Sequence, residues 1–151
     1  MSDATRPTIP ADGLLLGYGP MLPLVAAGCG VWLLPHPWPA LAIRLALIWG
    51  ALILAFIGGV RRGFGFARDT ASKPQEIAAA VIYVGVAGLA LVSPSPAIAL
   101  PVLAAGYALA ALMDRRAAVR GDAPRYFAKL RVPQLLLGVA GLLTCWARVL
   151  A

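Results

Sequence analysis

Two long stretches of this chain contain no formally charged side chain. They cover residues 13–43, between Asp12 and Arg44, and residues 77–113. A helix needs about 20 mostly apolar residues to cross the hydrocarbon core of a bilayer, so each stretch is long enough to hold a crossing. A soluble domain of 151 residues could not hide 61% apolar and only 13% charged residues, because small domains expose much of their surface. The sequence therefore predicts an integral membrane protein.

Proline clusters divide the two stretches. The segment PHPWP at 35–39 and the segment SPSP at 93–96 lack backbone donors and restrict the residues before each proline, so both should end a helix. We expect an all-α fold, an integral membrane bundle of about five transmembrane helices at 14–34, 39–60, 76–92, 97–113 and 132–151. Pro20 and Pro23 should kink the first helix. Residues 1–12 are expected to be a disordered cytoplasmic tail, and residues 13–151 a single transmembrane domain.

The basic residues predict the orientation of these spans. Eleven of the 13 Lys and Arg residues fall in the N-terminal tail and in two loops, 61–76 and 114–131, which five spans place on one side. The positive-inside rule assigns that side to the cytoplasm. We therefore expect a multi-pass protein of the cell inner membrane, with a cytoplasmic N-terminus and a periplasmic C-terminus. Arg44 either extends to the nearer interface or faces inward in a functional role, and Arg148 can reach the far interface.

Few residues in the chain have catalytic or metal-binding chemistry. The one histidine, His36, lies in a proline-rich turn and is expected to be a turn or interface residue. Cys29 and Cys145 lie in apolar segments without a second ligand at metal-binding spacing. The chain also lacks the phosphate-binding loop, the nucleophile elbow and the haem-attachment motif. We expect no enzyme activity, no cofactor and no metal. Nucleic-acid binding is not expected either, because the Arg residues lie in blocks between apolar segments.

The first of two polar clusters lies at the end of the second predicted helix. Gly58, Gly59 and Gly63 could let another helix approach closely, and Arg61 and Arg62 stand beside them at the membrane face. The arginines could be charges that only end the span. Alternatively they could bind an anionic headgroup or an acidic partner, because Arg forms bidentate bonds to phosphate and carboxylate.

The second polar cluster combines Asp114 with residues 124–131. Tyr126 can lie in the interface while basic residues such as Arg131 face water, which is typical of a segment on anionic lipid. A solvated basic loop is the alternative interpretation. The candidate binding residues for an anionic headgroup or a partner are therefore Arg61, Arg62, Asp114, Tyr126 and Arg131.

Both clusters resemble motifs of one bacterial family. The stretch Phe56-x-Gly58-Gly59-Val60-Arg61-x-Gly63 resembles the FLGGxRWG motif of the family called domain of unknown function 3429, whose relatives include mitochondrial transmembrane protein 69. The stretch Pro124-x-Tyr126-x-x-x-Leu130-Arg131 resembles the family's P-x-WY-x-x-LR segment before the last helix. With Tyr126 aligned to the family's tyrosine, Arg125 takes the place of a tryptophan, as Arg62 does in the first motif. The resemblance implies a multi-pass membrane protein and no particular reaction.

Three functional hypotheses remain open at this level. The first is a non-enzymatic accessory or assembly subunit of a larger membrane complex, with other membrane proteins and the anionic lipids of the cytoplasmic leaflet as partners. The second is a small transporter or a lipid- or quinone-binding protein that uses Arg61, Arg62 and Arg131. The third is a membrane enzyme, which would need an inward-facing polar group near Asp114 and Tyr126.

Overall fold

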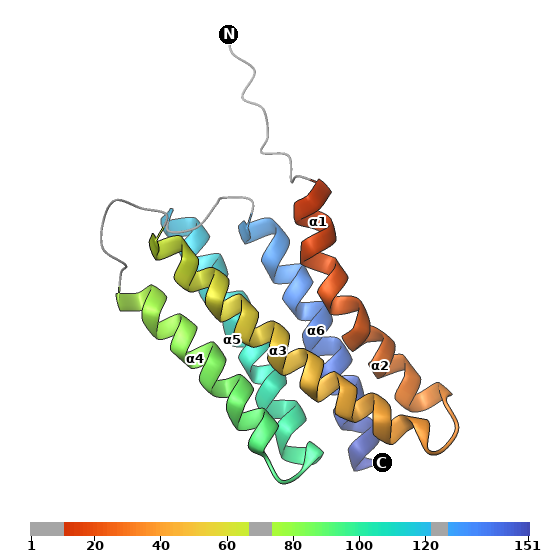
Figure 1. Cartoon of the computed structure of the whole chain (residues 1–151). Helices are drawn as coiled ribbons and strands as arrows, with labels where there is room; N and C mark the ends of the chain where they lie inside the picture. Colours follow the sequence, from red (N-terminus) through yellow and green to blue (C-terminus); the bar gives the residue numbers. More distant parts are fainter. Residues whose placement is uncertain (1–10, 67–73, 122–126) are drawn as a thin grey trace.

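The computed structural model describes residues 11–66, 74–121 and 127–151, and in these ranges the chain forms a bundle of helices (Figure 1). The elements are α1 (Ala11–Tyr18), η1 (Gly19–Met21), α2 (Leu22–Leu33), α3 (Trp38–Phe66), α4 (Pro74–Val92), α5 (Pro96–Arg120) and α6 (Phe127–Leu150). Five helical segments are long and apolar enough to cross a membrane, the first running from Gly13 to Leu33 through α1, η1 and α2. The predicted all-α fold with five spans is confirmed, and the chain is a multi-pass membrane protein.

Successive spans of the bundle run in opposite directions, whereas the first and last spans, which pack together, run in the same direction. α5 packs between α4 and α6, α3 packs against α2 and α4, and α2 closes the bundle against α6. Figure 1 shows that α1, α4 and α6 begin at the end where α3 and α5 finish, and that the C-terminus lies at the other end. We call the first the basic end, because it holds Arg61, Arg62, Arg115, Arg116, Arg120, Lys129 and Arg131.

The first span is kinked where the sequence predicts it. Pro23 has no N–H to donate to the carbonyl of Gly19, and Leu22 N–H donates to that carbonyl instead. The chain consequently tightens into the 3₁₀ turn η1 before α2 begins. The indole N–H of Trp49 on α3 donates to the carbonyl of Pro20 at 2.8 Å and ties the kink to the bundle.

A second proline is accommodated inside α5. Pro101 cannot donate to the carbonyl of Ala97, four residues earlier in the helix. The indole N–H of Trp146 on α6 donates to that carbonyl at 2.9 Å. An unsatisfied backbone group is costly in lipid, so this bond both permits the proline and joins α5 to α6.

The closest helix crossing joins α2 to α6. A Cβ at Gly28 would lie 3.0 Å from the carbonyl oxygen of Gly141, and a Cβ at Gly141 would overlap the backbone of Leu24. Gly138 lies one turn away, against the ring of Tyr107. The Tyr107 hydroxyl donates to the carbonyl of Gly50 at 2.9 Å, which connects α5 to α3 within the core.

Several helices are longer than predicted at the basic end. α3 continues to Phe66 instead of ending near residue 60, α5 continues to Arg120 instead of 113, and α6 begins at Phe127 instead of 132. With 29 residues in α3, a rise of 1.5 Å per residue gives about 44 Å, which exceeds the roughly 30 Å hydrocarbon core. Much of the two predicted loops is therefore helical. α1 begins at Ala11, inside the predicted tail, and residues 1–10 lie outside the described ranges.

Candidate functional site

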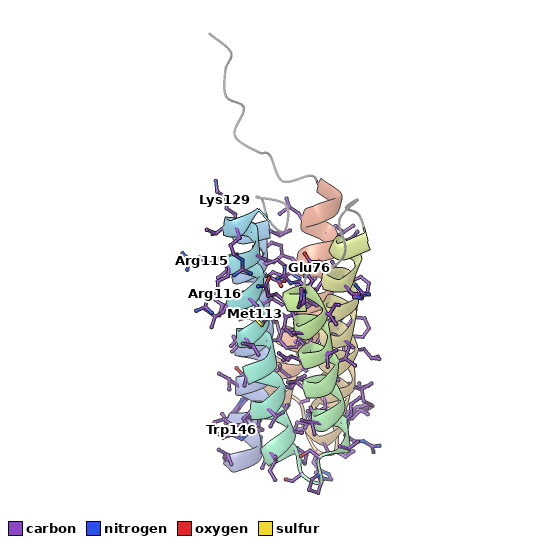
Figure 2. All side chains as sticks on the ribbon, turned by 90° about the vertical axis from the view of Figure 1, so that its left-hand side faces the viewer. Glu76, Met113, Arg115, Arg116, Lys129 and Trp146 are labelled. Atoms are coloured by element: carbon purple, nitrogen blue, oxygen red, sulfur yellow. The ribbon has the colours of Figure 1, made fainter. Side chains whose placement is uncertain are left out.

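Charged side chains are buried inside the basic end of the bundle. Arg61 on α3, Glu76 on α4 and Asp114 on α5 are 2–3% exposed, and Arg131 on α6 is 8% exposed. By contrast, Arg115, Arg116 and Lys129 extend outward from α5 and α6 in Figure 2, where Glu76 lies over the body of the bundle. Because an isolated buried charge is very costly, these inward groups need partners.

Asp114 is the centre of this buried cluster. Its Oδ1 lies 3.6 Å from Nε of Arg61, and its Oδ2 lies 3.9 Å from Nε of Arg131. The hydroxyl of Tyr83 on α4 donates a hydrogen bond to Oδ1 at 3.3 Å. One carboxylate therefore connects four helices, α3, α4, α5 and α6. We call Arg61, Tyr83, Asp114 and Arg131 the Asp114 cluster.

Helical spacing explains how α4 reaches this cluster. Glu76 and Tyr83 are seven residues apart, and Ala79, Ala87 and Ala90 share their buried face. The alanines keep α4 close to its neighbours, so that the long side chains of Glu76 and Tyr83 point inward between α3 and α5. Oε1 of Glu76 is buried and accepts no hydrogen bond, and Nε and Nη1 of Arg61 donate none. Hydrogen-bonding capacity therefore remains around the ion pairs.

A pocket of about 210 Å³ adjoins the cluster between α1, η1, α3 and α6. Its polar lining residues are Arg131 and Gln134, which lie three residues apart and so on one face of α6. Gln134 is 3% exposed, and its Oε1 accepts no hydrogen bond. The remaining walls are Gly13, Leu16, Gly17, Pro20, Ile53, Phe56, Ile57, Val60 and Leu130.

Comparison with known proteins places the chain in a family. The model of the family described as "Protein of unknown function (DUF3429)" matches residues 9–147, which is nearly the whole chain. The chain belongs to the DUF3429 family. No curated protein and no solved structure matches it.

The structure brings together the arginines of the two family-like motifs. In this DUF3429 protein Arg61 belongs to the first motif and Arg131 ends the second, and both contact Asp114. The three residues had been predicted to line the membrane edge, whereas the structure places them inside the bundle. Glu76 begins the predicted span 76–92 and Asp114 follows the predicted span 97–113, and the structure buries both carboxylates.

Other predicted site residues lie elsewhere. Arg62 is half-buried and lines a groove between α3 and α4, on a different face of α3 from Arg61. Tyr126 lies outside the described residues. Gly58 packs against α4, where its Cβ would lie 3.1 Å from the carbonyl oxygen of Ala80. A Cβ at Gly59 or Gly63 would meet no described atom within 4 Å, so these two contact no described helix closely, and their packing role stays a prediction.

Two side chains of the candidate site are not among the residues predicted from the sequence, Tyr83 and Gln134. For each of them, the spacing from another polar residue on the same helix is a signal in the sequence. Gln134 is a polar amide in an apolar span, where polar groups are expensive, and it follows Arg131 by three residues. Tyr83 follows Glu76 by two helical turns, although a tyrosine in a span is equally common in an apolar core.

The opposite end of the bundle carries Arg44, Arg148 and His36. Arg44 is exposed, which agrees with a side chain that extends to the interface. Arg148 donates from Nε to the carbonyl of Val31 at 3.1 Å and lies 5.6 Å from the ring centroid of Trp32. His36 is exposed in the turn between α2 and α3. The two contacts of Arg148 join α6 to α2 at this end.

Proposed function

We propose that this DUF3429 protein is a non-enzymatic accessory subunit that binds a helix of another membrane protein in a groove between α3 and α4. The observation that supports the proposal is a set of glycines with no neighbour. A Cβ at Gly59 or Gly63 on α3, or at Gly85 or Gly88 on α4, would meet no atom within 4 Å. Glycine weakens a helix by about 1 kcal/mol relative to alanine, so glycines that serve no contact within the fold call for another explanation.

The groove is lined mostly by small side chains. Its volume is about 470 Å³, and its walls are Ala55, Gly58, Gly59, Arg62, Ala80, Val81, Val84 and Gly85. Helices associate in lipid mainly through close packing, and small residues let two backbones approach. The pattern Gly59-xxx-Gly63, which the sequence singled out for helix packing, is thus free for a helix from outside the chain.

The burial of Asp114 argues against a catalytic role for its carboxylate. The Tyr83 hydroxyl is the inward-facing polar group that an enzyme would need, but it donates to Asp114. The carboxylate is 3% exposed and already faces two guanidinium groups. A reacting substrate atom would have to displace these partners to reach it. The cluster therefore fits a structural role that fixes four helices around one point.

The distribution of charge supports a location for the subunit. We assign it to the cell inner membrane with its basic end in the cytoplasm, since short basic loops remain on that side. In this orientation Arg62 places a cation at the cytoplasmic end of the groove.

Site-specific photo-crosslinking would test the groove. A photoreactive residue at Val81, an exposed groove residue on α4, should join the chain to one partner in native membranes, which mass spectrometry would identify. The same probe at Leu136, exposed on α6 outside the groove, is the matched control and should not give that product.

A groove-filling variant gives the second part of the test. Gly59→Ile places a branched side chain in the groove and should abolish both the crosslink at Val81 and co-purification of the partner in mild detergent. Ala105→Ile adds the same side chain to an exposed position on α5 and should preserve both. A monomer without a partner at native expression, or a partner retained in Gly59→Ile, would refute the proposal.

A second candidate function is lipid binding. It is favoured by the pocket beside Arg131 and Gln134, which lies on another side of α3 and does not depend on the groove.

A further inference from the structure

We propose that the pocket between α1, η1, α3 and α6 binds the headgroup of an anionic phospholipid that also carries a hydroxyl. Arg131 would hold the phosphate, and Gln134 would accept a hydrogen bond from the headgroup hydroxyl. The chemistry required is a phosphodiester with a neighbouring hydroxyl, as in phosphatidylglycerol.

The pocket is apolar at its mouth and polar at its base. Leu16 on α1 and Phe56 on α3 are 73% and 65% exposed, and in a membrane both would contact lipid. Arg131 and Gln134 lie within the bundle, where they are 8% and 3% exposed. A ligand that enters between α1 and α3 would thus pass from hydrocarbon to a polar base, which suits a molecule with acyl chains and a polar head.

Gln134 determines what kind of head the pocket takes. Gln134 lines the pocket, and its Oε1 is buried and accepts no hydrogen bond from any described residue. Gly17 leaves room beside this oxygen, since a Cβ there would lie 3.4 Å from it. Buried polar atoms in native proteins nearly always have a partner. An amide oxygen requires a donor, which a hydroxyl supplies and a choline headgroup or an oxidised quinone does not.

Arg131 supplies the complementary donors. A guanidinium has five N–H groups in a planar fork that matches two phosphate oxygens, so contact with Asp114 through Nε is compatible with a second anion. The pocket also lies at the basic end, where the phosphates of one leaflet are found.

Lipid titration of the purified protein tests this assignment. The probes are dioleoylphosphatidylglycerol, dioleoylphosphatidylmethanol, dioleoylphosphatidylcholine and inorganic phosphate, and native mass spectrometry in a zwitterionic detergent measures the Kd of each. Phosphatidylmethanol has the same charge as phosphatidylglycerol but lacks the hydroxyl. We expect phosphatidylglycerol to bind roughly five- to ten-fold more tightly than phosphatidylmethanol, which is the effect of one hydrogen bond. Phosphatidylcholine should bind more weakly than either.

Variants connect the preference to the pocket. Gln134→Leu has a similar volume and removes the amide, so it should bind phosphatidylglycerol and phosphatidylmethanol equally while its melting temperature without lipid stays close to wild type. Arg44→Gln removes an exposed arginine at the opposite end and should keep the full preference.

Other outcomes would overturn the inference. If the wild type bound phosphatidylglycerol and phosphatidylmethanol equally, the headgroup hydroxyl would make no contact that contributes to binding. If Gln134→Leu kept the preference for phosphatidylglycerol, the hydroxyl would be bound outside this pocket. Equal binding of phosphatidylcholine and phosphatidylglycerol would show that the pocket does not require a headgroup with a net negative charge. Inorganic phosphate bound as tightly as phosphatidylglycerol would assign the site to a soluble anion. None of these results affects the α3–α4 groove, so the two proposals can fail separately.

Discussion

At the scale of single residues, the buried position of Asp114 most changes the interpretation of the charged residues at the basic end. The sequence places Arg61 in one polar cluster and Asp114 and Arg131 in another at the same membrane edge, and the structure joins them. Their burial was not predictable from local pattern, since a charge after a long apolar run is normally the end of a span. α3, α5 and α6 can extend past their charged residues because they pack together, which gives each charge a partner inside the protein.

Removing the shared carboxylate should therefore destabilise the bundle strongly. Asp114→Leu leaves Arg61 and Arg131 buried without their anion, and we expect a loss of about 3–5 kcal/mol in the free energy of unfolding. Unfolding in mixed micelles, followed by circular dichroism, would measure it. The triple variant Arg61→Met, Asp114→Leu, Arg131→Met replaces the whole buried cluster by apolar groups and should recover most of that loss.

Arg116→Met is the matched control for this series. Arg116 is exposed on α5 two residues after Asp114, so its loss should change stability by no more than about 0.5 kcal/mol. An Asp114→Leu variant as stable as Arg116→Met would show that the ion pairs do not hold the helices together.

At the scale of helices, the positions of proline and glycine were the best guide in the sequence to where helices end, bend and pack closely. The proline clusters divided the apolar stretches correctly, and Pro20 and Pro23 marked the kink. The ends of α3, α5 and α6 were misplaced because they depend on tertiary contacts of the charged residues. The glycines show the same limit. A sequence shows where a close approach is possible, but not which glycines meet a helix of the same chain, as Gly28 and Gly141 do, and which do not.

Opposite effects are expected from alanine at two of these glycines. Gly141→Ala would drive a methyl group into the backbone of Leu24 and should cost about 1–3 kcal/mol. Gly88→Ala adds a methyl group where nothing lies within 4 Å, and should stabilise α4 by about 0.5–1 kcal/mol through helix propensity. Thermal unfolding of the two variants in the same detergent measures both. Equal effects would mean that the α2–α6 crossing is looser than described.

At the scale of the whole molecule, composition and charge were enough to predict a five-span bundle. The order of helices around the bundle was not predictable, because apolar faces that can pack in several ways look alike in sequence. The contact of α2 with α6 joins distant parts of the chain through Gly28 and Gly141 and through Arg148 with Val31. This closure brings η1 beside α6 and thereby creates the pocket that contains Gln134.

Membrane topology tests the account most directly, since the account requires five spans with the basic end facing the cytoplasm. Two reporters should be fused after Ala151, one an enzyme active only in the periplasm and the other a fluorescent protein that matures only in the cytoplasm. A chain with five spans and a cytoplasmic basic end predicts an active enzyme and a dark fluorescent protein. An inactive enzyme together with a bright fluorescent protein would contradict the number of spans or their orientation.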